Sequence, residues 1–162
     1  MALSSRAFQR RNRTTAGMTL LELIIACAIL LVLSTAALPV ARMTVKRQKE
    51  AELRRTLREM RTAIDRYKDA ADRNLIRVEV GSEGYPPDLE TLVRGVQLGA
   101  AAERRVRFLR RISVDPMTGR AEWGLRAIQD DPNSTSWGGS NVFDVYSRST
   151  GIALDGTRYA DW

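Results

Sequence analysis

The sequence predicts an α+β protein in which a long amino-terminal α-helix, apolar in its first half, packs against a small antiparallel β-sheet. Residues 18–41 form one apolar run, and residues 53–71 carry apolar side chains at helical spacing. Residues 123–128 and 142–147 are short runs with aromatic and β-branched side chains between turns, which is typical of strands. A chain of 162 residues has room for one small domain besides the apolar helix.

The apolar run is long enough to cross a membrane. It has 24 residues, against the roughly 20 that a transmembrane helix needs, and Glu22 is its only charged residue. By the positive-inside rule, the arginines before it predict a cytoplasmic amino terminus: Arg6, Arg10, Arg11 and Arg13. The carboxyl-terminal domain would then lie on the other side of the membrane.

Glu22 does not fit a plain membrane anchor. A carboxylate in hydrocarbon is costly unless a partner neutralises it, and the run contains no basic residue. Gly17 stands before the run, whereas the small residue of a secretory signal follows its apolar segment. Cleavage after Gly17 would keep the helix and create an amine at Met18, which can neutralise Glu22 in its own helix or in a neighbouring copy.

Residues 17–23, GMTLLEL, and the apolar run behind them resemble the class III signal of the type IV filament superfamily. That superfamily comprises type IV pilins and the pseudopilins of type II secretion. The resemblance implies that a prepilin peptidase cuts after Gly17 and N-methylates Met18, where the family usually has Phe. It also implies that Glu22 is needed for assembly and that Pro39 interrupts the helix. The alternative is an ordinary signal anchor with a stray acid.

Composition limits the partners, disulfides and catalytic sites that the protein can have. The formal net charge is +7, and removal of the four leader arginines would leave +3, so no nucleic-acid partner is expected. Cys27 is the only cysteine, so the exported domain has no disulfide, and it lacks the carboxyl-terminal disulfide loop common in type IV pilins. The chain has no histidine, which excludes a serine triad and indicates that the protein is not an enzyme.

Beyond the apolar run, the helix is expected to continue over residues 42–73. One apolar stripe runs along it: Leu53, Leu57, Met60, Ile64, Tyr67 and Ala71. Charged residues cover its other faces and read as a solvated surface: Arg54, Arg55, Arg58, Glu59, Arg61, Asp65 and Arg66. Pro39 predicts a kink or local loosening of the helix around residues 34–39.

The middle of the chain alternates between short elements and turns. Residues 75–80 read as a short strand or an irregular extension, and Asp88 is a predicted N-cap for a short helix over residues 89–94. Residues 84–93, GYPPDLETLV, resemble the loop after the long helix of the major pseudopilin. Residues 95–107 read as a partly helical insertion without an assigned function. Residues 108–162 are the predicted β-sheet region, and their carboxyl end is also similar to the major pseudopilin.

Aspartates in the carboxyl-terminal loops allow two interpretations, and the first is a set of solvated loop acids: Asp130, Asp131, Asp144, Asp155 and Asp161. The second is calcium, which takes six to eight oxygen ligands and suits irregular loops. The family resemblance implies a calcium site in the last loop, with Asp155 and Asp161 as ligands. Calcium bound there would stabilise the fold, and the predicted function requires no cofactor.

The resulting hypothesis is a structural subunit with a leader (residues 1–17), a transmembrane and filament-core helix half (18–41) and a soluble pilin-like domain (42–162, with loop and short helix at 81–94). The resemblance implies a pseudopilus of a type II secretion system, anchored in the bacterial inner membrane with its domain in the periplasm. Its partners would be copies of itself, the prepilin peptidase, other pseudopilins, the inner-membrane assembly platform and membrane lipid. The alternatives are a surface type IV pilin and a membrane-tethered binding module that does not polymerise.

Overall fold

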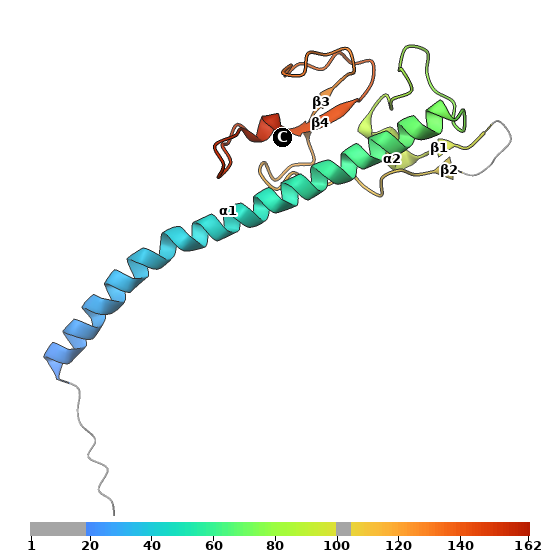
Figure 1. Cartoon of the computed structure of the whole chain (residues 1–162). Coiled ribbons are helices and arrows are strands. Elements are labelled where there is room, and N and C mark those ends of the chain that lie inside the picture. Colours follow the sequence, from blue (N-terminus) through green and yellow to red (C-terminus); the bar gives the residue numbers. More distant parts are fainter. Residues whose placement is uncertain (1–18, 100–104) are drawn as a thin grey trace, which may run out of the picture. The chain divides into compact units, whose positions relative to one another are not determined.

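The computed structural model describes residues 19–99 and 105–162, and for residues 36–41 it describes the backbone alone. The chain divides into two units, Met1–Arg42 and Met43–Trp162, and each is described here by itself. Figure 1 shows the long helix α1 and the smaller elements that follow it in the second unit. The expected mixture of a long amino-terminal helix with small antiparallel sheets is confirmed.

Helix α1 covers Leu20–Asp72 and starts with a side-chain cap. Thr19 precedes it, and the Thr19 hydroxyl accepts a hydrogen bond from the amide of Glu22 at 3.2 Å. A Thr followed three residues later by Glu is a capping-box pattern, which satisfies amides that the first helical turn leaves open. The helix runs through Pro39 without interruption. The kink predicted around residues 34–39 stays a prediction.

Within the described residues, no helix combines the length and apolarity required of a membrane span.

The second half of α1 carries the core. All six residues of the predicted stripe are buried, with exposed fractions between 0% and 9%. The helix ends at Asp72, inside the predicted limit, and Asn74 follows with a left-handed φ of 56°. The amides of Asn74 and Leu75 bond back to the carbonyls of Ala71 and Ala70, which is the Schellman arrangement that terminates a helix.

Helix α2 covers Leu89–Arg94, as predicted. Asp88 is its N-cap, and its Oδ1 accepts from the amide of Thr91 at 2.6 Å and from the hydroxyl of Thr91 at 2.8 Å. Gly95 ends the helix with φ 78°, and a Cβ there would lie 2.7 Å from the carbonyl oxygen of Val106. This turn therefore requires glycine.

In the described part of the chain, four short strands form two separate antiparallel sheets. β1 (Val96–Gln97) pairs with β2 (Arg105–Val106), and β3 (Trp123–Arg126) pairs with β4 (Asp144–Ser147). The prediction of one small antiparallel sheet was therefore wrong for the described residues, which form two. The prediction of partly helical structure for residues 95–107 was also wrong for their described part, which forms β1 and β2. Residues 75–80 take the irregular alternative and contribute one isolated bridge, Ile76 with Leu98.

The sheets stay small because backbone groups beside them find other partners. The amides of Ala127 and Ile128 bond to the side chains of Asp130 and Asn141, which ends β3 two residues before its predicted limit. Between β2 and β3, the amide of Asp115 donates to the carbonyl of Arg120 at 2.8 Å, within a turn. These segments therefore satisfy their hydrogen bonds locally and offer no ladder to a neighbouring strand.

Candidate functional site

Two regions carry the residues that the sequence singled out: the amino-terminal motif and the carboxyl-terminal loop. Gly17 and Met18 lie outside the described residues, so cleavage and methylation stay predictions. Glu22 is exposed and stands in the first turn of α1, where the amides leave a partial positive charge that favours a carboxylate. Local structure therefore accommodates Glu22 at this position before any partner is considered.

The first part of α1 is apolar on all sides. Leu30, Leu31, Val32 and Leu33 are consecutive and are 61%, 68%, 69% and 61% exposed. A helix has 3.6 residues per turn, so four consecutive side chains point in all directions around its axis. A helix that is hydrophobic all round needs an apolar surrounding on every face, which membrane lipid or other helices can supply.

The carboxyl-terminal segment, residues 149–162, is held on α1 by a row of charged side chains. Lys46 Nζ donates to the carbonyl of Ile152 at 2.7 Å, and Arg54 pairs with Asp155 at 3.2 Å. Between them, Glu50 Oε1 accepts from the amide of Leu154 and from the hydroxyl of Tyr159, each at 2.9 Å. Lys46, Glu50 and Arg54 are four residues apart and lie on one face of α1, and we call them the polar ladder.

Glu50 and Tyr159 form the buried step of the polar ladder. Their exposed fractions are 6% and 4%. Burial, together with the hydrogen bond to the Glu50 carboxylate, raises the pKa of Tyr159 to about 12. The phenol therefore stays protonated as the donor at physiological pH.

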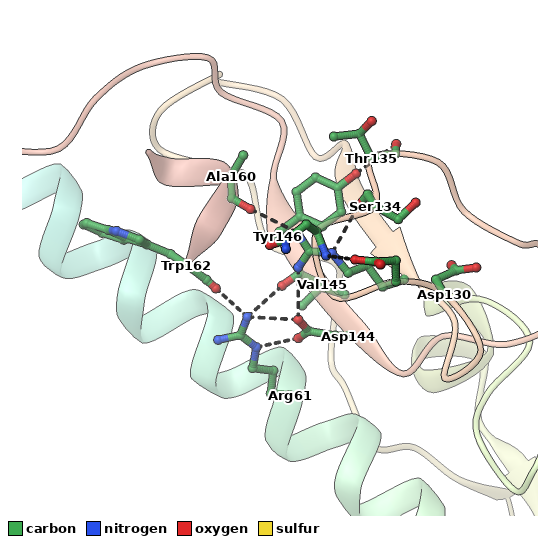
Figure 2. Close-up of polar contacts among 12 residues, drawn as sticks. Arg61, Asp130, Ser134, Thr135, Asp144, Val145, Tyr146, Ala160 and Trp162 are labelled. Atoms are coloured by element: carbon green, nitrogen blue, oxygen red, sulfur yellow. Dashed lines mark hydrogen bonds and ion pairs between the residues drawn. The ribbon is translucent and has the colours of Figure 1, made fainter. Parts of the chain in front are cut away.

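Two arginines meet at Asp144, the first residue of β4 (Figure 2). Arg61 on α1 binds both carboxylate oxygens, at 2.7 and 3.3 Å, and Arg126 on β3 approaches one of them at 3.4 Å. Arg61 Nη2 also donates to the carbonyls of Val145 at 3.1 Å and Trp162 at 2.5 Å. This bidentate geometry ties β4 and the last residue to α1.

Arg126 extends this network to the loop after β3 and to the carboxyl-terminal segment. Its guanidinium lies 4.2 Å above the ring of Tyr146 and donates to the carbonyls of Ala160 and Ser134 at 3.3 and 3.2 Å. Tyr146 in turn covers Gly124, where a Cβ would meet the ring at 2.2 Å.

The two predicted calcium ligands are already engaged by arginines. Asp155 Oδ1 accepts from the hydroxyl and amide of Thr157, and Oδ2 faces Arg54. Those hydrogen bonds from Thr157, with a smaller contribution from Arg54, hold the pKa of Asp155 below its ordinary value. Asp161 binds Arg158 through both oxygens, at 3.1 and 3.2 Å.

Calcium would have to displace these guanidinium groups. It needs six to eight oxygens, and in the described part of the chain no three acidic or cysteine side chains gather as a metal-ion site. The donor set does not favour calcium as arranged, and calcium binding at Asp155 and Asp161 stays a prediction.

The other candidate acids have structural contacts. Asp130 accepts from the amides of Ala127 and Gly138, at 2.7 and 3.1 Å, and thereby closes the loop after β3. Asp131 accepts from the amide of Asn133 at 2.9 Å in the same loop. The interpretation as loop acids accounts for both residues.

Comparison with known protein families finds a match near the amino terminus. Residues 12–38 match the prokaryotic N-terminal methylation motif, the prepilin-type signal. The motif supports a type IV pilin-like protein. Pilin-like proteins of this kind are structural subunits, processed by a prepilin peptidase and anchored by their amino terminus in a membrane. No curated protein and no solved structure matches the chain.

The match includes Gly17, Met18 and Glu22, and it ends one residue before Pro39. Sequence reasoning missed Thr19, although the spacing of Thr19 and Glu22 is visible in the sequence. It also assigned Arg54 and Arg61 to a solvated surface, whereas both bind the carboxyl-terminal part of the chain. Their partners are 101 and 83 residues away, so no local pattern could have identified them.

Proposed function

We propose that the chain is a structural subunit that polymerises into the pseudopilus of a type II protein secretion system after prepilin peptidase processing. The observation that carries this proposal is the methylation motif at residues 12–38, joined to a helix that is apolar on all sides. In the proposed cycle, the subunit waits in the inner membrane with its domain in the periplasm. It then moves into a filament in which the apolar helices bundle.

Glu22 has a defined task in this proposal. The amine created at Met18 carries a positive charge, and in the filament it pairs with Glu22 of an adjacent subunit. Two opposed charges in an apolar bundle are favourable only when both are present and close. The pair therefore fixes the axial register of neighbouring helices as well as contributing stability.

A pseudopilus is preferred over a surface pilus because of the carboxyl-terminal segment. With Cys27 as the only cysteine, no disulfide closes that segment, and the polar ladder holds it instead. A surface type IV pilin is the second candidate, because the methylation motif fits both kinds of filament. Gene deletion separates them: loss of enzyme secretion indicates the pseudopilus, and loss of surface fibres or twitching indicates the pilus.

Processing is the first experiment. Mass spectrometry of the amino-terminal peptide from membranes should give a chain that starts at Met18 with one added methyl group. A chain that still starts at Met1 in the presence of the peptidase would contradict the proposal and favour a simple membrane tether.

The role of Glu22 is tested with three variants of that residue and one control. Glu22→Val and Glu22→Gln should both be processed but should not form filaments, because both lose the charge. Thr19→Ala is the control, since it removes only the helix cap, worth about 1 kcal/mol, and should still assemble. Normal filaments from Glu22→Gln would show that capping rather than charge explains this residue. A harmless Glu22→Leu would favour the tethered module.

A further inference from the structure

A basic trough follows one face of α1 in the second unit. Two hollows of about 550 and about 340 Å³ share Arg55 and Glu59 in their linings. The helix contributes Arg55, Arg58 and Arg66, and the segment after β2 contributes Arg110 and Arg111. We call these five residues and the surface between them the arginine trough. Glu52 and Glu59 are the only acids in its lining, so the trough has a formal charge of +3.

The segment that carries Arg110 and Arg111 is held firmly beside α1. Phe108 packs edge-on against Tyr67 with ring centroids 5.5 Å apart. The amides of Phe108 and Leu109 both donate to the carbonyl of Leu92 at 3.0 Å. The shape of the trough is therefore set by the core before any partner binds.

The side chains of all five arginines are exposed, and none of them forms a hydrogen bond or ion pair with another described residue. The contrast within the same unit is clear, because Arg54, Arg61 and Arg126 each have a carboxylate partner. Five guanidinium groups without a carboxylate lie around one trough, where an anion would relieve their mutual repulsion. The guanidinium fork matches carboxylates in particular.

The trough is elongated, which limits its occupant. Arg55 and Arg66 are separated by about 16 Å along the helix, from the rise per residue. A single small anion contacts one or two guanidinium groups, whereas a segment with several carboxylates can contact the whole length. The occupant is therefore a stretch of acidic polypeptide.

The chain itself carries such a stretch from the loop after α1 into the first turn of α2. Glu79, Glu83 and Glu90 are exposed within twelve residues, and none forms an ion pair with a described residue. This acidic segment, residues 79–90, follows the carboxyl end of α1 (Figure 1), whereas the trough lies on earlier turns of the helix. Within one copy, the two surfaces form no ion pair with each other.

We propose that the arginine trough of one copy binds the acidic segment 79–90 of a second copy. The two surfaces are different and lie at different heights along α1, so the contact is heterologous. A heterologous contact repeats into a ring when the rotation between copies closes and into an open helical filament when it does not, and the open case fits the proposed filament. This inference rests on the proposed function and assigns a specific contact between the domains of the filament.

Cysteine cross-linking in membranes tests the contact with the full chain. In a Cys27→Ser background, copies with Arg58→Cys and copies with Glu79→Cys, carrying different epitope tags, are produced together. The mixed disulfide should form at least about five times more readily than between Arg120→Cys and Glu79→Cys, where Arg120 lies outside the trough. Equal yields from the two pairs would overturn the proposal.

Charge reversal tests whether the contact matters for assembly. Arg55→Glu, Arg58→Glu and Arg66→Glu together should lower filament yield about tenfold, and so should Glu79→Lys with Glu90→Lys. Combining both sets should restore most of the yield. Glu83 is left unchanged because its φ of 52° makes its turn sensitive to substitution. Arg120→Glu is the matched control and should assemble normally.

The outcomes separate this inference from the proposed function. If the unaltered chain forms no filaments, the proposed function fails, and with it the role of the trough in assembly. If the unaltered chain forms filaments and the trough variant does too, only the trough contact is wrong. If the trough variant assembles normally but no longer binds vesicles rich in phosphatidylglycerol, the occupant is an anionic membrane surface and the proposal is overturned.

Discussion

Removal of the Glu50 carboxylate is the perturbation that tests the polar ladder most directly. In Glu50→Ala, the buried hydroxyl of Tyr159 and the amide of Leu154 both lose their acceptor. A buried donor left without a partner costs about 1–3 kcal/mol, and a more accessible amide costs less because water can replace its partner. The expected loss in the free energy of unfolding is therefore about 2–3 kcal/mol.

This loss converts into a measurable shift of the melting temperature. The second unit has about 120 residues, from Met43 to Trp162. Unfolding entropy of about 2.1 cal/mol/K per residue then gives a decrease of about 8–12 °C. The buried indole of Trp123, 4% exposed, reports unfolding of this unit by fluorescence in the detergent-solubilised full chain.

Glu52→Ala is the matched control for this experiment. Glu52 is an exposed residue of the same helix without a hydrogen bond or ion pair to another described residue, so its removal changes helix propensity equally but breaks no contact. A double-mutant cycle with Tyr159→Phe should give a coupling energy of about 1–2 kcal/mol between Glu50 and Tyr159. Equal melting temperatures for the two alanine variants, or no coupling, would refute the reasoning.

Three further predictions concern the same loops. Asp144→Asn should lower the free energy of unfolding by about 1–3 kcal/mol, because two arginines lose their carboxylate partner. The control Glu122→Gln should change the free energy of unfolding by less than about 0.5 kcal/mol, because Glu122 meets Arg120 only at 4.0 Å on the surface. Chemical denaturation at a series of pH values should show that the contribution of Tyr159 to stability is constant and fully present below about pH 10 and is lost as pH rises toward 12, because the folded state holds this phenolic proton more tightly. The same decline in Tyr159→Phe would contradict that assignment. Addition of calcium or of a chelator should shift the melting temperature by less than about 1 °C, which corresponds to about a quarter of a kcal/mol for a domain of this size. A larger calcium-dependent rise that Asp155→Asn abolishes would support the predicted calcium site.

Elements set by local patterns could be predicted from the sequence. The stripe on α1 depends only on helical spacing, and every member of it is buried. Helix α2 depends on Asp88, the residue immediately before it, whose side chain caps its amino end. The amino-terminal motif is likewise contained in one short segment, which matches the methylation motif.

Features that depend on distant partners could not be predicted. Glu50 and Arg61 appear in the sequence as charged residues on a helix that has many of them, and nothing nearby distinguishes them from Glu52 or Arg58. Their partners lie between 83 and 109 residues further along the chain. The length of the strands was overestimated because local side chains replace a neighbouring strand. The side chains of Asp130 and Asn141 accept from amides that an alternating pattern assigns to strand pairing.

The polar ladder also has a consequence for the order of events during export. Lys46, Glu50 and Arg54 enter the translocation path early, but their partners belong to the last fourteen residues of the chain. Contacts of such sequence separation form late, because closing a long loop costs entropy before the contact is made. In the proposed export, Glu50 remains without its partners until residues 149–162 have emerged, so folding of the domain finishes only after that segment has been translocated. A subunit stalled partway through the membrane would present the core stripe of α1 without the strands that cover it, and would be open to proteolysis until residues 149–162 arrive.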